Sequence, residues 1–175
     1  MRTNRVGLYF QSMRALTLPD LARLTILVVD DNDDSLAMLA TFLKACGAEV
    51  LQASNALEAL NYIHTESGAD VVITDVSMPH IDGVELVRRL RRHPAHASIP
   101  VIALSGFPAL VQTAFYEYYK DQNGFDAFLR KPADLDELCK TIRMVINNRR
   151  RKVDSERAGP ASDSTASAAL KGGGN

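Results

Sequence analysis

Apolar and polar positions follow two alternating patterns between about residue 24 and residue 148. Short apolar runs rich in β-branched residues, typical of buried strands, alternate with segments whose apolar residues recur every three or four positions, as in helices. The strand-like runs are 25–30, 49–53, 71–75, 100–104 and 125–129. The helical spacing occurs from about Leu36, over 55–65, 84–92 and 109–121, and from about Asp134.

This alternation of five strands with five helices predicts an α/β domain over residues 24–148. Helices that connect successive parallel strands cover both faces of one sheet. Two terminators support the assignment. Gly47 is placed to end the first helix, and Asp134 with Glu137 forms a capping-box pattern at the start of the last.

Both ends of the chain differ in character from this region. The segment GLYFQSM at 7–13 resembles the remnant of a protease-cleavable expression tag, so we exclude 1–13 from the fold. The run Arg-Arg-Arg-Lys at 149–152 predicts a solvated helix end, because cations suit a helix C-terminus. Residues 158–175 are mostly small and polar, and we expect 149–175 to be a basic and then disordered tail.

Composition limits the class of protein. A chain of 175 residues with 46% hydrophobic residues can form one core, and a net charge of −1 gives no general attraction to nucleic acid or an anionic membrane. No apolar run approaches the roughly 20 residues needed to span a bilayer. Cys46 and Cys139 predict two buried free thiols in a reducing, cytoplasmic environment rather than a disulfide.

Carboxylates follow two of the predicted strands. Asp30 and Asp31 come at the end of the first strand, and Asp75 ends the third. Sites form at the carboxyl ends of parallel strands, so these carboxylates can meet in one pocket, where their repulsion favours a divalent cation. A carboxylate beside such a metal can attack a phosphoryl group and become an acyl phosphate. Alternatively, Asp30 and Asp31 belong to a helix-capping cluster.

Two further polar residues follow the fourth and fifth strands. Ser105 ends PVIALS, and Lys131 follows FDAFLR. A lysine ammonium can bind a phosphoryl oxygen or pair with a carboxylate, and a serine hydroxyl can donate to a phosphoryl oxygen. Each residue is common by itself, so the joint occurrence at successive strand ends is the informative observation.

Four segments together resemble the receiver domain of two-component response regulators: ILVVDDND, DVSMPHIDG, ALSG and FLRKP. The resemblance covers about residues 24–148. It implies a flavodoxin-like, doubly wound parallel sheet with the strand order 2-1-3-4-5. It also implies that Asp75 is the phospho-acceptor, and that Asp30, Asp31 and the backbone carbonyl of Ser77 hold Mg²⁺ (or Mn²⁺) together with Asp75.

The same resemblance implies a switch and its partners. Ser105 is the expected hydroxyl switch, Lys131 the phosphate-sensing lysine and Phe128 the switch aromatic. A sensor histidine kinase or a histidine phosphotransfer protein would donate the phosphoryl group. A downstream protein or adjoining domain would bind the fourth helix, fifth strand and fifth helix, and a homodimer is compatible with this surface. We expect no enzyme activity beyond slow self-dephosphorylation, and no direct contact with nucleic acid or membrane.

Two other functions stay open at this point. A haloacid-dehalogenase-like phosphatase also uses an aspartyl nucleophile, and Asp31-x-Asp33 imitates its nucleophile and acid, although no cap segment or later acidic motif is evident. A pseudo-receiver would bind proteins without being phosphorylated. The histidines at 64, 80, 93 and 96 fall in helix ends and loops, where we expect surface residues and no ligand arrangement.

Overall fold

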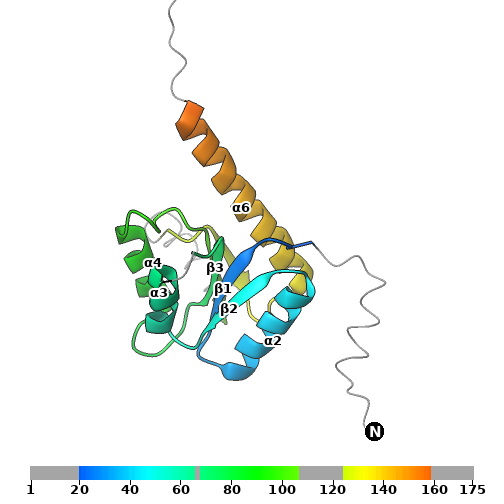
Figure 1. Ribbon diagram of the computed structural model, residues 1–175. Helices are drawn as coiled ribbons and strands as arrows, with labels where there is room; N and C mark the ends of the chain where they lie inside the picture. The colour runs from blue at the N-terminus through cyan, green and yellow to red at the C-terminus, as the bar shows by residue number, and fades with distance from the viewer. Residues whose placement is uncertain (1–19, 66–67, 107–123, 159–175) are drawn as a thin grey trace, which may run out of the picture.

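The computed structural model describes residues 20–65, 68–106 and 124–158 (Figure 1). The strands are β1 (Thr25–Val29), β2 (Glu49–Ala53), β3 (Val71–Asp75), β4 (Val101–Ser105) and β5 (Ala127–Arg130). The helices are α2 (Asp33–Ala45), α3 (Ala56–Thr65), α4 (Gly83–Arg92) and α6 (Leu135–Ala158). The helix predicted over 109–121 lies outside the described residues.

The five strands form one parallel sheet in the order β2-β1-β3-β4-β5, which confirms the predicted fold. The chain moves outward from β1 to β2 and then returns to place β3 on the other side of β1. At such a reversal, the connections after the two central strands leave toward opposite faces, and a crevice opens at their carboxyl ends. The ends of β1 and β3 are where the sequence places its carboxylates.

Successive strand residues point to opposite faces, and each face has its own core. Ile26 and Val28 pack with α2 and α6, whereas Leu27 and Val29 pack with α3 and α4. Every residue of β3 and β4 is buried, as the continuous apolar runs predict for the centre of a sheet with two covered faces.

Side-chain caps set the starts of three helices. The side chain of Asn32 accepts a hydrogen bond from the Ser35 amide at 2.8 Å, so Asn32 is the N-cap of α2. Asp82 caps α4 in the same way, and Asp134 accepts a bond from the Glu137 amide at 2.8 Å. Because Asn32 caps α2, the capping interpretation of Asp30 and Asp31 is not needed.

The last helix is longer than the sequence analysis predicts. The predicted domain boundary at residue 148 falls within this helix, because α6 continues through the basic run to Ala158 and its C-terminal part projects beyond the sheet (Figure 1). Residues 147–158 contain no glycine or proline, and Arg, Lys and Glu favour helix. Although α6 has 24 residues, no helix in the described ranges is long and apolar enough to cross a bilayer.

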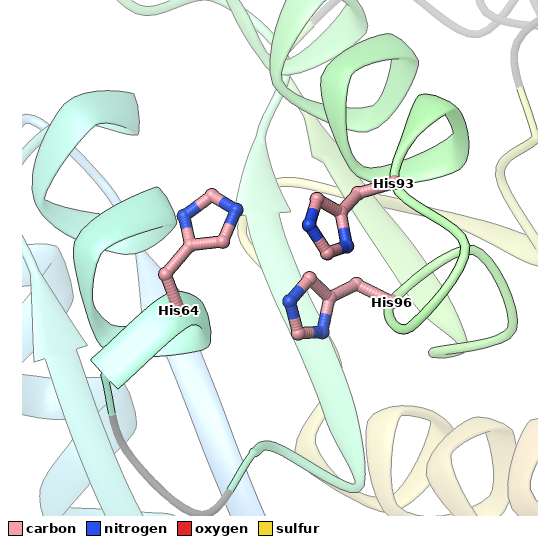
Figure 2. A group of neighbouring side chains, drawn as sticks. All are labelled: His64, His93 and His96. Atoms are coloured by element: carbon pink, nitrogen blue, oxygen red, sulfur yellow. The ribbon is translucent and has the colours of Figure 1, made fainter.

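Three of the four histidines lie side by side (Figure 2). His64 is in the last turn of α3, His93 is the C-cap residue of α4, and His96 is in the following turn. The ring centroids of His93 and His96 are 4.5 Å apart, and each is 5.2 Å from that of His64. The sequence analysis expects the histidines at the surface, which holds for the exposed His64 and His93, but it does not predict this grouping.

Candidate functional site

The three predicted carboxylates meet at the carboxyl ends of β1 and β3. Asp30 directly follows β1, Asp75 is the last residue of the neighbouring β3, and carboxylate oxygens of Asp30, Asp31 and Asp75 lie within 4.8 Å of one another. Asp30 is 3% exposed and Asp75 8%, whereas Asp31 is exposed. Two buried carboxylates and one exposed carboxylate thus form an acidic pocket that solvent can reach.

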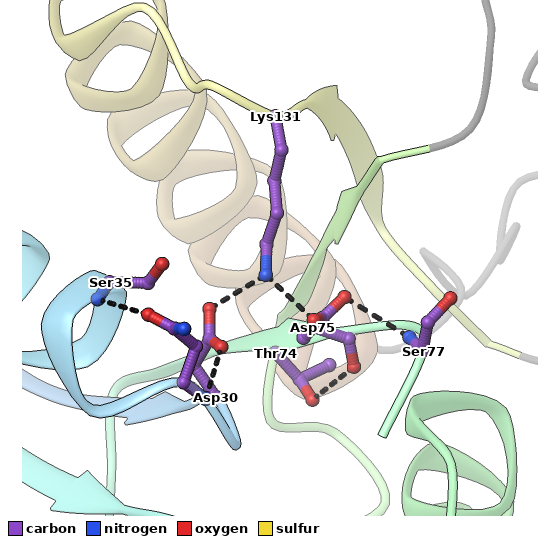
Figure 3. Close-up of polar contacts among 7 residues, drawn as sticks. Asp30, Ser35, Thr74, Asp75, Ser77 and Lys131 are labelled. Atoms are coloured by element: carbon purple, nitrogen blue, oxygen red, sulfur yellow. Dashed lines mark hydrogen bonds and ion pairs between the residues drawn. The ribbon is translucent and has the colours of Figure 1, made fainter. Parts of the chain in front are cut away.

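Lys131 joins the two buried carboxylates (Figure 3). Its ammonium donates to Oδ2 of Asp30 and to Oδ2 of Asp75, each at 2.7 Å. Burial by itself lowers the pKa of Lys131, but the hydrogen bonds and charges of the two aspartates outweigh burial, and the pKa is raised above its ordinary 10.5. The lysine therefore stays charged and compensates part of the negative charge of the pocket.

The backbone after β3 holds Asp75 in place. The Ser77 amide donates to Oδ1 of Asp75 at 3.1 Å, so Lys131 and this amide each bind one carboxylate oxygen. The Gly83 amide donates to the Val76 carbonyl at 3.0 Å, which folds the loop back onto the end of the strand. A Cβ at Gly83 would collide with the carbonyl oxygen of Asp75, so this close approach requires glycine.

Ser105 lies at the same edge of the sheet, and Phe128 lies on one face. Ser105 is fully buried at the end of β4, and its carbonyl accepts a hydrogen bond from the Lys131 amide at 2.8 Å. Phe128 is half-buried on β5, packs against the core shared with α3 and α4, and has its ring centroid 4.8 Å from that of Phe125. The structure thus brings Lys131 into contact with the carboxylates and places Ser105 at the same edge of the sheet, whereas Phe128 packs in the core on one face.

The donor set of the acidic pocket fits a small, hard divalent cation. The pocket offers carboxylate oxygens, which Mg²⁺ prefers, and the exposed Asp31 leaves one side open to the waters that Mg²⁺ retains. The ammonium of Lys131 is a cation already in contact with Asp30 and Asp75, so an incoming phosphoryl group can take over its hydrogen bonds.

The comparison with known proteins agrees with this geometry. Residues 26–143 match the family model of the response regulator receiver domain. The chain belongs to this family. It is therefore a receiver domain of a two-component system. Receiver domains are in general phospho-acceptors that bind Mg²⁺ at an acidic pocket.

Two relatives illustrate how receiver domains occur in proteins of different size. The chain is 37% identical over 124 residues to an uncharacterized 14.6 kDa protein of Leptolyngbya boryana, covering 70% of this chain and 89% of that protein. It is 36% identical over 142 residues to a 3′,5′-cyclic-nucleotide phosphodiesterase of Dictyostelium discoideum, covering 78% of this chain but 17% of that protein. The receiver domain thus corresponds to a small part of the larger relative.

A solved structure and a sensor kinase that resemble this chain point to the same family. A receiver domain protein from Clostridium thermocellum has a TM-score of 0.62 and 31% identity, covering 74% of this chain and 98% of that chain. The sensor histidine kinase RcsC of Escherichia coli is 31% identical over 132 residues, covering 74% of this chain and 13% of that protein. Relatives of this kind support a partnership of receiver domains with histidine kinases.

The phosphatase alternative does not fit the site. It needs Asp31 as nucleophile and Asp33 as acid, but Asp33 is an exposed residue at the first position of α2. The buried carboxylate bound by the lysine is Asp75 instead. Together with the family match, this placement favours the receiver interpretation over the phosphatase interpretation.

The sequence analysis missed the histidine cluster. The spacing of His93 and His96, three residues apart after a helix, was a local signal that both rings could point the same way. The contribution of His64 comes from a different helix and has no local signal.

Proposed function

We propose that Asp75 is the phospho-acceptor of this receiver domain, and that Asp30, Asp31 and the backbone carbonyl of Ser77 hold Mg²⁺ beside it. The observation that best supports this assignment is the ion pair between Lys131 and the buried Asp75 carboxylate. Lys131 orients this carboxylate at the edge of the sheet, where it can act as a nucleophile.

This arrangement supports a proposed route for the phosphorylation of Asp75. The Asp75 carboxylate oxygen attacks the phosphorus of a phosphohistidine, the P–N bond breaks as the O–P bond forms, and the imidazole leaves with a proton. Bound Mg²⁺ supplies positive charge for the phosphoryl oxygens. Lys131 exchanges its contact with Asp75 for a contact with a phosphoryl oxygen, because the phosphoryl group carries more negative charge than the carboxylate. We expect no turnover beyond slow self-dephosphorylation.

Ser105 and Phe128 would transmit this event. The Ser105 hydroxyl is proposed to bind a phosphoryl oxygen, and Phe128 to adjust its packing on β5. The backbone bond from the Lys131 amide to the Ser105 carbonyl links the ends of β4 and β5, so a shift of one strand end moves the other. The responding surface would consist of segment 109–121, which lies outside the described residues, together with β5 and α6, and its equilibrium would be biased toward a partner-binding state.

The phosphodonor is proposed to be a sensor histidine kinase or a histidine phosphotransfer protein, in line with the kinase relatives. A downstream protein, an adjoining domain or a second copy of the chain would bind the responding surface. We further propose that 24–148 is the receiver domain proper; the predicted tail 149–175 lies outside the described residues beyond Ala158.

The assignment of Asp75 is tested by intact mass after incubation with acetyl phosphate and Mg²⁺. We expect one added phosphoryl group on the wild type and none on Asp75→Asn. Asp82→Asn is the matched control, because Asp82 is in the same loop and asparagine also caps a helix well, so it should be phosphorylated as the wild type is. Phosphorylation of Asp75→Asn would exclude the assignment, and an unmodified wild type would favour a pseudo-receiver.

A further inference from the structure

We propose that His64, His93 and His96 form a second metal site that binds one divalent transition-metal ion of the zinc class. A ring nitrogen from each histidine lies within 4.8 Å of the other two. Figure 2 shows the His64 ring extending from α3 toward the other two rings, which come from the end of α4 and the turn after it. The ligand set is therefore assembled from two separate parts of the chain.

The donor chemistry distinguishes this site from the acidic pocket. Neutral imidazole nitrogens suit Zn²⁺, Cu²⁺ and Ni²⁺, whereas Mg²⁺ prefers oxygen ligands. A tetrahedral Zn²⁺ with Zn–N bonds of about 2.0–2.1 Å places its ligand nitrogens about 3.4 Å apart. His64 and His93 are exposed and His96 is half-buried, so side-chain rotation can close the remaining gap, which is at most about 1.4 Å. Water would occupy the fourth position.

Two of the ligands are held on a rigid turn. The His96 amide donates to the His93 carbonyl at 2.9 Å, and the Ile99 amide donates to the His96 carbonyl at 3.0 Å. The guanidinium of Arg91 stabilises the turn, because it donates hydrogen bonds to the carbonyls of Ala97 at 3.0 Å and Ile99 at 2.7 Å. Little backbone freedom remains to be lost when this pair binds an ion, which favours affinity.

The third ligand is anchored by its neighbour in sequence. His64 follows Ile63, which is 2% exposed and packs in the core between the sheet, α3 and α4. A metal bound by His64, His93 and His96 would cross-link the C-terminal ends of α3 and α4. These helices run opposite to the strands, so their C-terminal ends lie at the amino edge of the sheet, away from Asp75. The ion can therefore bind without using the acidic pocket.

The test is a Zn²⁺ titration of the full chain in competition with a chromogenic chelator, with excess Mg²⁺ present to occupy the acidic pocket. We expect one Zn²⁺ per chain, bound at least about tenfold more weakly by each of His64→Gln, His93→Gln and His96→Gln. The chain has four histidines, and the fourth, His80, supplies the control. His80 has a φ of 65°, which asparagine tolerates, so His80→Asn should fold and bind Zn²⁺ as the wild type does.

Several outcomes would overturn the proposal. One is an equal Zn²⁺ affinity in the wild type and in the double variant His93→Gln/His96→Gln. Another is the loss of Zn²⁺ binding in Asp75→Asn. The third is a stoichiometry of half a Zn²⁺ ion per chain. Melting temperatures without metal should match among the variants, because the exposed His64 and His93 contribute little to packing. As a second readout, Co²⁺ should give the visible absorption of a tetrahedral nitrogen site in the wild type and lose it in the double variant.

Discussion

The ammonium of Lys131 lies 2.7 Å from a carboxylate oxygen of Asp75, although β4 lies between β3, which ends at Asp75, and β5, which Lys131 follows. The same ammonium is 2.7 Å from Asp30. The long lysine side chain thus extends past the end of β4 and joins the ends of β1, β3 and β5. This one group compensates two buried carboxylates, and under the proposed function it lies where a phosphoryl oxygen would require a cation.

Replacing Lys131 with alanine should have opposite effects on stability and on metal binding. Asp30 and Asp75 would be left buried without a cation, and we expect the free energy of unfolding to fall by about 1–3 kcal/mol in urea denaturation without Mg²⁺. Mg²⁺ should bind more tightly because no ammonium competes with it. Lys131→Arg keeps the charge and should lose less stability. Unchanged stability together with unchanged Mg²⁺ affinity would contradict the role assigned to this ion pair.

Gly83→Ala should destabilise the protein and impair the site. The added methyl group would collide with the Asp75 carbonyl and crowd Val76, and the loop must shift to avoid it, at a cost of about 1–3 kcal/mol. Urea denaturation measures this loss, and intact mass measures the slower phosphorylation of a displaced Asp75. Gly106→Ala is the control, because a Cβ there meets no heavy atom within 4 Å. Equal stability of the two variants would show that the loop accommodates the added methyl group without cost, and it would contradict the requirement for glycine.

Arg91→Met should loosen the connection between α4 and β4. The Arg91 guanidinium binds the carbonyls of Ala97, Ile99 and Gly124, and it forms an ion pair with Asp126 at 3.0 Å. Because methionine leaves these acceptors unsatisfied, we expect a loss of about 2 kcal/mol and faster amide exchange around residues 97–101. Arg92→Met on the exposed face is the control and should be nearly neutral. Similar losses in both variants would contradict a specific role for Arg91.

The two cysteines should be inert in the folded protein. Burial, followed by the neighbouring Cys46, raises the pKa of Cys139 to about 12, and burial also raises the pKa of Cys46. At pH 8 we therefore expect a disulfide-exchange reagent to label neither thiol in the native state and both in urea, because the thiolate is the reactive form. Rapid labelling without urea would contradict the buried pair.

The same pKa shift predicts a pH dependence of stability. The folded-state pKa of Cys139 lies above the unfolded value of 9.0, so its contribution to stability is complete below pH 9 and is lost as the pH rises toward 12. The urea midpoint should fall between pH 8 and pH 10, and it should fall less in Cys46→Ala/Cys139→Ala. An equal decrease in both proteins would assign the effect to other groups.

The local signals of the sequence determined the secondary structure and most of the acidic pocket. Strand and helix periodicities depend on neighbouring residues, and the carboxyl ends of parallel strands share one edge, so Asp30, Asp31, Asp75 and Ser105 could be brought together from their positions alone. The sequence near the end of α6 also indicates a long helix, because the first glycine and proline after the basic run are residues 159 and 160. The basic composition had suggested an earlier end.

Tertiary structure decided the contacts between elements distant in the chain. The sequence placed Lys131 at a strand end, but the two simultaneous bonds to Asp30 and Asp75 depend on the spacing of three strands and on the lysine rotamer. His64 meets His93 and His96 because α3 and α4 cover the same face of the sheet and end at the same edge. No periodicity of the chain encodes such a meeting, since it follows from how two helices pack on a common sheet.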